Sequence, residues 1–158
     1  MTTLIQGDTA LLDTDLARGL LASTELARMA YVVGDGTPRV LPMLFHWTGE
    51  EVVMATFGGA HKINALRARP DVAITIDTSA TPPQSISLRG RAELTDVEGL
   101  VPEYVFAHRR YGGAEQAAAV VAELDRPGMR MVRIAVRPAW VATLDFRTRF
   151  PAAAPMGG

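Results

Sequence analysis

The chain has 158 residues, of which 48% are hydrophobic and 21% charged, and its formal net charge is −1. This length is enough for one domain with a real core, and a net charge near zero gives no general field for attracting nucleic acid. Because the chain contains no cysteine, disulfides, thiolate metal sites and cysteine nucleophiles are all excluded.

The two ends of the chain carry little information about targeting. The N-terminal stretch has acidic residues where a signal peptide has a basic region and an apolar run, and no apolar stretch reaches the roughly 18 residues that span a bilayer. We therefore expect a cytoplasmic protein with no membrane partner. We expect residues 1–150 to form a single domain, and residues 151–158, which are Ala, Pro, Met and Gly, to form a flexible tail.

Six segments have the composition and alternation of β-strands and are separated by turn residues such as those at 34–38 and 48–50. The strands are predicted at residues 26–33, 39–47, 52–57, 72–77, 85–94 and 129–144. Short turns between most neighbours favour antiparallel pairing, and closure into a barrel removes exposed edges. The pattern predicts a mainly β fold with flanking helices (α+β), a six-stranded antiparallel Greek-key barrel. An open α+β sandwich is the alternative.

Helices are predicted between these strands. A short helix capped by Asp13 or Thr14 precedes the first strand, and further helices are expected at 61–69, 97–110 and 114–124. The segment 39–47 is apolar on both faces, so we expect it to be covered on both sides. Pro42 lies within this segment and has no amide to donate, so it requires a sheet edge, a bulge or a gap in the pairing.

The segment from Ala55 to Lys62 carries the clearest chemistry. A strand ends in Gly58 and Gly59, and a helix with a basic residue in its first turn follows. Glycines let backbone amides approach an anion, the first turn of a helix offers unpaired donors, and Lys62 adds a full charge. The pattern predicts a phosphate-binding loop. A plain strand-to-helix turn with a surface lysine is the alternative.

Three groups of residues carry a resemblance to a known family. They are the strand Arg39, Val40, Leu41, Pro42 and Met43, then Ala55, Thr56, His61 and Lys62, and then Gln84 at the start of a further strand. In type, order and spacing these groups resemble the pyridoxamine 5′-phosphate oxidase-like FMN-binding split β-barrel superfamily, over residues 26–150. The resemblance implies that the first strand runs along the flavin, that Thr56, His61 and Lys62 grip the phosphate, and that Gln84 reaches the ring.

The chain departs from that family at two places. His61 stands where the family commonly has arginine, so the phosphate grip loses a permanent charge. The C-terminal segment after Asp145 lacks the Arg- and His-bearing pattern of the pyridoxamine oxidases proper, which argues against pyridoxamine phosphate oxidation. The chain looks more like the short, often actinobacterial branch of the superfamily, some members of which use the deazaflavin coenzyme F420.

The resemblance implies an FMN- or F420-dependent oxidoreductase that transfers hydride to or from a small-molecule substrate and works as a homodimer. A non-catalytic protein that stores or senses flavin, F420 or haem is the alternative. No catalytic residue is assigned, because the hydride chemistry belongs to the cofactor. We expect no metal site, because His46, His61 and His108 lie on different predicted elements without a completing carboxylate.

Overall fold

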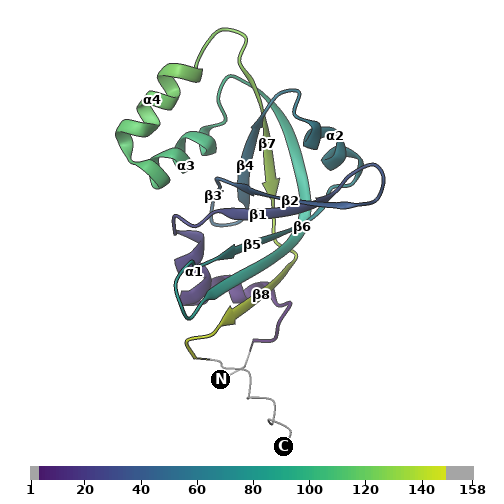
Figure 1. Cartoon of the computed structure of the whole chain (residues 1–158), viewed down its shortest axis with the longest axis vertical. Coiled ribbons are helices and arrows are strands. Elements are labelled where there is room, and N and C mark those ends of the chain that lie inside the picture. The colour runs from purple at the N-terminus through teal and green to yellow at the C-terminus, as the bar shows by residue number, and fades with distance from the viewer. Residues whose placement is uncertain (1–3, 149–158) are drawn as a thin grey trace, which may run out of the picture.

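The computed structural model describes residues 4–148 and has a strongly bent antiparallel sheet flanked by helices (Figure 1). The helices are a short 3-10 turn η1 (Thr9–Asp13), α1 (Asp15–Leu21), α2 (His61–Ala68), α3 (Pro102–Gly112) and α4 (Ala114–Leu124). The strands are β1 (Ala27–Val32), β2 (Pro38–Met43), β3 (His46–Trp47), β4 (Val52–Phe57), β5 (Asp71–Asp77), β6 (Gln84–Glu98), β7 (Arg130–Val136) and β8 (Trp140–Asp145). None of the helices within the described range is long and apolar enough to cross a membrane.

All the strand pairs are antiparallel, and the strand order is β2-β1-β5-β6-β7-β4-β3, with β8 paired to the first half of β6. The path starts at β2 and ends at β3, and no hydrogen-bonded pair joins these two ends within residues 4–148. The result is a mainly β, α+β architecture consistent with a split barrel. β2 is therefore an edge strand, the position that Pro42 requires.

The long strand β6 connects the two halves of the sheet. Its first half pairs with β5 and β8, and its second half pairs with β7. Gly90 lies between these halves, where a Cβ atom would come within 2.5 Å of the carbonyl oxygen of Arg137. Glycine is thus required there by the close approach of another backbone.

The prediction of six strands is wrong, because the structure has eight within residues 4–148. The predicted strand 129–144 divides into β7 and β8 at Pro138, which cannot donate to a ladder, and the amide of Ala139 bonds to Arg89 of β6 instead. The predicted strand 39–47 likewise divides into β2 and β3. The helix predicted from residue 97 begins at Pro102, because β6 continues to Glu98 and the chain then turns at Gly99 (φ +88°).

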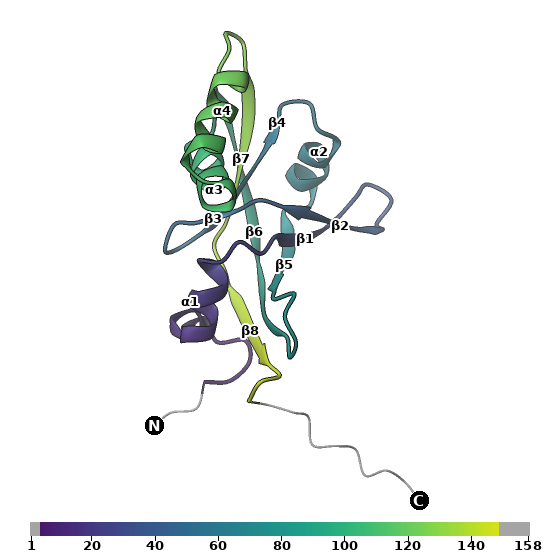
Figure 2. The same ribbon diagram turned by 60° about the vertical axis from the view of Figure 1, so that its left-hand side comes forward.

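The core lies inside the bent sheet and under α1 and α2. Ile63 and Leu66 of α2 are buried in it at the predicted three-residue spacing, and α1 adds Leu20 and Leu21. Each fully buried side chain of this size contributes about 1.5–3 kcal/mol. Figures 1 and 2 show α2 on one side of the sheet, the α3–α4 hairpin on the other, and α1 beside β8 at the lower end. The predicted tail, residues 151–158, falls outside the described residues.

Candidate functional site

The predicted phosphate-binding loop connects β4 to α2. The amide of Gly58 is already used, since it donates to the carbonyl of Arg130 at 3.1 Å. Gly59 has a φ of +86°, which favours glycine, and lets the chain turn into the helix. Ala60 is the N-cap of α2 and makes no side-chain capping bond. The amides of Gly59, His61 and Lys62 have no acceptor among the described residues, so the start of the helix keeps free donors.

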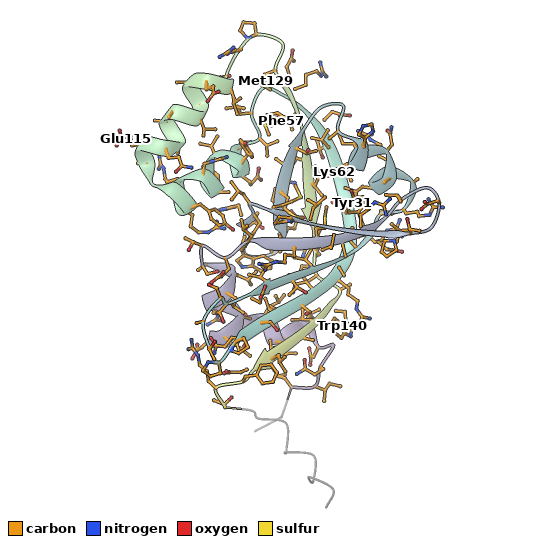
Figure 3. All side chains as sticks on the ribbon, viewed as in Figure 1. Tyr31, Phe57, Lys62, Glu115, Met129 and Trp140 are labelled. Carbon is orange, nitrogen blue, oxygen red and sulfur yellow. The ribbon has the colours of Figure 1, made fainter. Side chains whose placement is uncertain are left out.

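The polar side chains of this connection belong to Thr56, His61 and Lys62. His61 is exposed and Lys62 half-buried, and neither forms an ion pair within residues 4–148. Figure 3 labels Lys62 on α2, above Tyr31 of β1. Thr56 is only 8% exposed, and its hydroxyl has no hydrogen-bond partner among the described residues. Free donors, a free cation and an unpaired hydroxyl together make this loop able to hold a phosphate.

The alternation of β4 explains where its last residues point. Met54 and Thr56 share the face toward the core, because residues two apart lie on the same side of a strand. Ala55 and Phe57 share the other face, and the ring of Phe57 makes an edge contact with Tyr104 of α3 at 6.3 Å between centroids. Thr56 therefore lies on the same side as the buried face of α2, while Ala55 points away from the loop.

The β2 segment lies along the same side of the molecule as α2. Arg69, the C-cap of α2, donates to the carbonyl of Gly34 in the β1–β2 turn, and both ribbon views show this hairpin beside α2 (Figures 1 and 2). Leu41 and Met43 face the core, and Met43 is only 9% exposed. Met43 therefore points into the core of this chain.

The other face of β2 is open. Val40 is 68% exposed, which corrects the expectation that this strand is covered on both sides within one chain. Pro42 is also exposed, and the guanidinium of Arg39 bonds locally to Thr37 and to the carbonyl of Pro38. The free edge and the apolar outer face of β2 are the parts that could receive a ligand.

Gln84 lies far from the loop within one chain. Thr56 pairs with Val132, which pairs with Asp96 on β6, twelve residues after Gln84 on the same strand. Twelve strand residues correspond to roughly 40 Å along the chain. Gln84 instead lines a hollow beside α1 with Leu16. Thr56, His61 and Lys62 belong to the same β4–α2 connection, whereas Gln84 lies twelve residues along β6 from the level of Thr56.

A cleft of about 740 Å³ adjoins the loop and was not predicted. Phe57, Gly58 and Gly59 form one wall, and the α4–β7 turn with Arg126 and Arg130 forms the other. Neither arginine makes an ion pair within residues 4–148. The sequence shows two arginines around a Pro-Gly turn, but nothing in it shows that this turn lies opposite the loop.

Comparisons with known proteins identify the family and the fold. The model of the family described as "Pyridoxamine 5'-phosphate oxidase" matches residues 14–153. A solved F420 reductase is 28% identical, with a TM-score of 0.59 over 78% of this chain and 93% of that one. An FMN-binding protein related to pyridoxamine 5′-phosphate oxidase, from Nostoc punctiforme, is 13% identical (TM-score 0.56; 78% and 75% covered). HutZ, the heme storage protein from Vibrio cholerae, is 16% identical (TM-score 0.56; 78% and 88% covered). No curated protein matches the sequence significantly.

Proposed function

Because this chain belongs to the pyridoxamine 5′-phosphate oxidase family, we propose that it binds FMN or the deazaflavin coenzyme F420 and acts as an oxidoreductase on a small-molecule substrate. The observation that carries the proposal is the set of unpaired donors at the start of α2. When bound, such a cofactor supplies the hydride chemistry, and the protein supplies position and electrostatics.

In this proposal each element of the site has one task. The amides of His61 and Lys62 and the charge of Lys62 hold the phosphate, which both cofactors carry next to their ring-bearing chain. The hydroxyl of Thr56, near the end of β4, donates a further hydrogen bond to this phosphate. The outer face of β2, with Val40 and Pro42, offers an apolar surface and an unpaired backbone edge for the ring system.

We further propose that the working unit is a homodimer whose second copy completes the site. Within one chain, Gln84 lies twelve strand residues from Asp96, which is level with Thr56, so we propose that Gln84 reaches the ring from a second copy. Apolar side chains exposed near both regions, Val40 and Leu144 among them, fit an interface between copies. Gln84 of a second chain would then approach the ring held by the first.

The similar proteins bear on the choice between FMN and F420 and on whether the chain is an enzyme or a storage protein. The 28% identity to an F420 reductase supports F420, whereas the family and the FMN-binding neighbour support FMN. A non-catalytic binding or storage role is the second candidate, because the same phosphate-holding residues would serve storage as well as catalysis. The similarity to a heme storage protein agrees with that role.

Titration of the full chain with matched ligands tests the proposal. FMN and its dephosphorylated form riboflavin are compared by quenching of flavin fluorescence, and F420 and haem by changes in absorbance. We expect saturable binding of FMN or F420, with FMN at least tenfold tighter than riboflavin. Equal binding of FMN and riboflavin would show that the loop does not hold the phosphate. Failure to bind FMN, riboflavin, F420 or haem would contradict the proposal.

A further inference from the structure

A second cleft, of about 470 Å³, lies between α1, β3 and α3. Figures 1 and 2 show these three elements together on the side of the sheet away from α2. The walls carry three arginines, Arg18, Arg109 and Arg110, and three rings, His46, Trp47 and Phe106. The volume falls within the range of small-molecule pockets. This cleft shares no lining residue with the loop between β4 and α2.

The positive charge of this cleft is not neutralised by its own walls. Within residues 4–148, no Asp or Glu lines it. Arg110 donates from Nε to the carbonyl of Ser23 at 2.9 Å and from Nη2 to the carbonyl of Phe45, and it forms no ion pair among the described residues. Its guanidinium is thereby fixed in position as an uncompensated cation. A partly buried cation without a counter-charge favours the binding of an anion.

The other two arginines add to this charge at the rim. Arg109 forms no ion pair within residues 4–148, and Arg18 contacts only Asp13, at 3.3 Å. Both side chains of that contact are mostly exposed, so water and salt weaken it. Arg18 and Arg109 can therefore turn toward a ligand without losing a strong interaction.

The rings give the cleft a flat apolar wall. Phe106 is 50% exposed, unusual for a phenyl group, and its ring lies 5.3 Å from that of His46. Burial, and then the charge of Arg110, lower the pKa of His46 and keep its imidazole neutral at neutral pH. Trp47 is half-buried beside it. Aromatic surface next to fixed guanidinium groups matches a flat ligand with an anionic group at one end.

We propose that this cleft binds a small aromatic carboxylate. The ring packs on Trp47 and Phe106, and the carboxylate accepts hydrogen bonds from Arg109 and Arg110. The proposal is independent of the cofactor proposal, since it uses no residue of the β4–α2 loop. A planar carboxylate such as that of benzoate matches the planar guanidinium of Arg110.

Four small probes distinguish the contribution of the anionic group to binding from that of the aromatic ring. Benzoate, benzamide, cyclohexanecarboxylate and phenyl phosphate are titrated into the full chain, and binding is followed by saturation-transfer NMR. The tryptophan fluorescence of a Trp140→Phe variant gives a second readout, because Trp47 is then the sole tryptophan and Trp140 lies elsewhere, under the guanidinium of Arg89. We expect benzoate to bind and quench Trp47, with benzamide and cyclohexanecarboxylate each about tenfold weaker.

Single substitutions test whether benzoate binds in this cleft. Arg109→Gln should weaken benzoate about tenfold and leave benzamide unchanged, because one charge-assisted hydrogen bond is lost. Phe106→Ala should weaken both. The matched control is Arg137→Gln, whose side chain pairs with Glu50 outside the cleft. Equal affinities for benzoate and benzamide, tighter binding of phenyl phosphate, no effect of Arg109→Gln, or loss of benzoate binding in Lys62→Ala would each overturn the proposal.

Discussion

Arg133 of β7 donates a hydrogen bond of 2.7 Å to Glu103 of α3, and this contact ties the α3–α4 hairpin to the sheet. Glu51 also contacts this guanidinium, at 3.7 Å from the same nitrogen. Burial alone would raise the pKa of Glu103, but the hydrogen bond and charge of Arg133 lower it below its ordinary value of 4.5. The pair therefore stabilises the fold wherever the carboxylate is ionised.

The first prediction concerns this pair. Glu103→Gln should lower the free energy of unfolding at pH 7 by about 1–3 kcal/mol, because a partly buried guanidinium loses its closest charged partner. A carboxyl with a lowered folded-state pKa stabilises above its unfolded-state pKa, and that contribution is lost as pH falls through the folded-state value. The difference between wild type and variant should thus shrink below about pH 4.5, as urea unfolding at a series of pH values would show. A difference independent of pH would contradict this role.

His108 carries the second prediction. Both its ring nitrogens are enclosed without a hydrogen-bond partner among the described residues, and burial lowers its pKa below the ordinary 6.5. Because the unfolded chain binds this proton more readily, stability should fall as pH drops below about 6.5. His108→Leu should raise the free energy of unfolding by roughly 1 kcal/mol and flatten the pH dependence between 5 and 6.5. Thermal melts at pH 7.5 and 5 measure this, with exposed His61→Leu as the control. A destabilised His108→Leu protein would show that the imidazole has a favourable partner.

The third prediction compares two glycines. A Cβ at Gly90 would meet a backbone carbonyl oxygen at 2.5 Å and the side chain of Val136 at 2.9 Å, whereas Gly19 in α1 has open space. Gly90→Ala should destabilise the protein by about 1–3 kcal/mol because of this clash. Gly19→Ala should stabilise it by about 0.5–1 kcal/mol, because alanine has the higher helix propensity. Chemical denaturation of both variants is the measurement. A neutral Gly90→Ala would mean that the β7–β8 connection moves freely away from β6.

Local patterns predicted individual elements well. The strand 52–57 and the helix 114–124 agree with β4 and α4 at both ends, since turn residues bound them on each side. Pro138 marked the break between β7 and β8, but the apolar residues on both sides of Arg137 and Pro138 favoured one long strand. These features depend on neighbours in the chain, which a sequence displays directly.

Long-range geometry was not predictable. Arg133 meets Glu103 across 30 residues, and that contact depends on how α3 lies on the sheet. The collinear order of Thr56, Lys62 and Gln84 gave no distance between them, because order along a chain does not specify on which end of a long strand a residue lies. The clefts beside Arg126 and Arg109 follow from the same tertiary packing.

The fourth prediction addresses the phosphate role of Lys62. Lys62→Ala should weaken FMN about tenfold or more and change riboflavin little, because only the phosphate contacts the ammonium group. His61→Arg should strengthen FMN several-fold, since it adds a permanent charge with two parallel donors. Fluorescence titration measures both, with Arg137→Ala as a control outside the loop. Equal losses for FMN and riboflavin in Lys62→Ala would place the lysine away from the phosphate.

The last prediction tests whether two chains share one site. If Lys62 of one chain and Gln84 of another hold the same cofactor, homodimers of Lys62→Ala and of Gln84→Ala should both bind it weakly. A mixed dimer of the two variants has one site with both substitutions and one with neither. Differently tagged chains, co-expressed and purified through both tags, should therefore bind one cofactor per dimer with wild-type affinity. A site contained in one chain would give two weak sites and no recovery, and a purified monomer with full affinity would contradict the shared site outright.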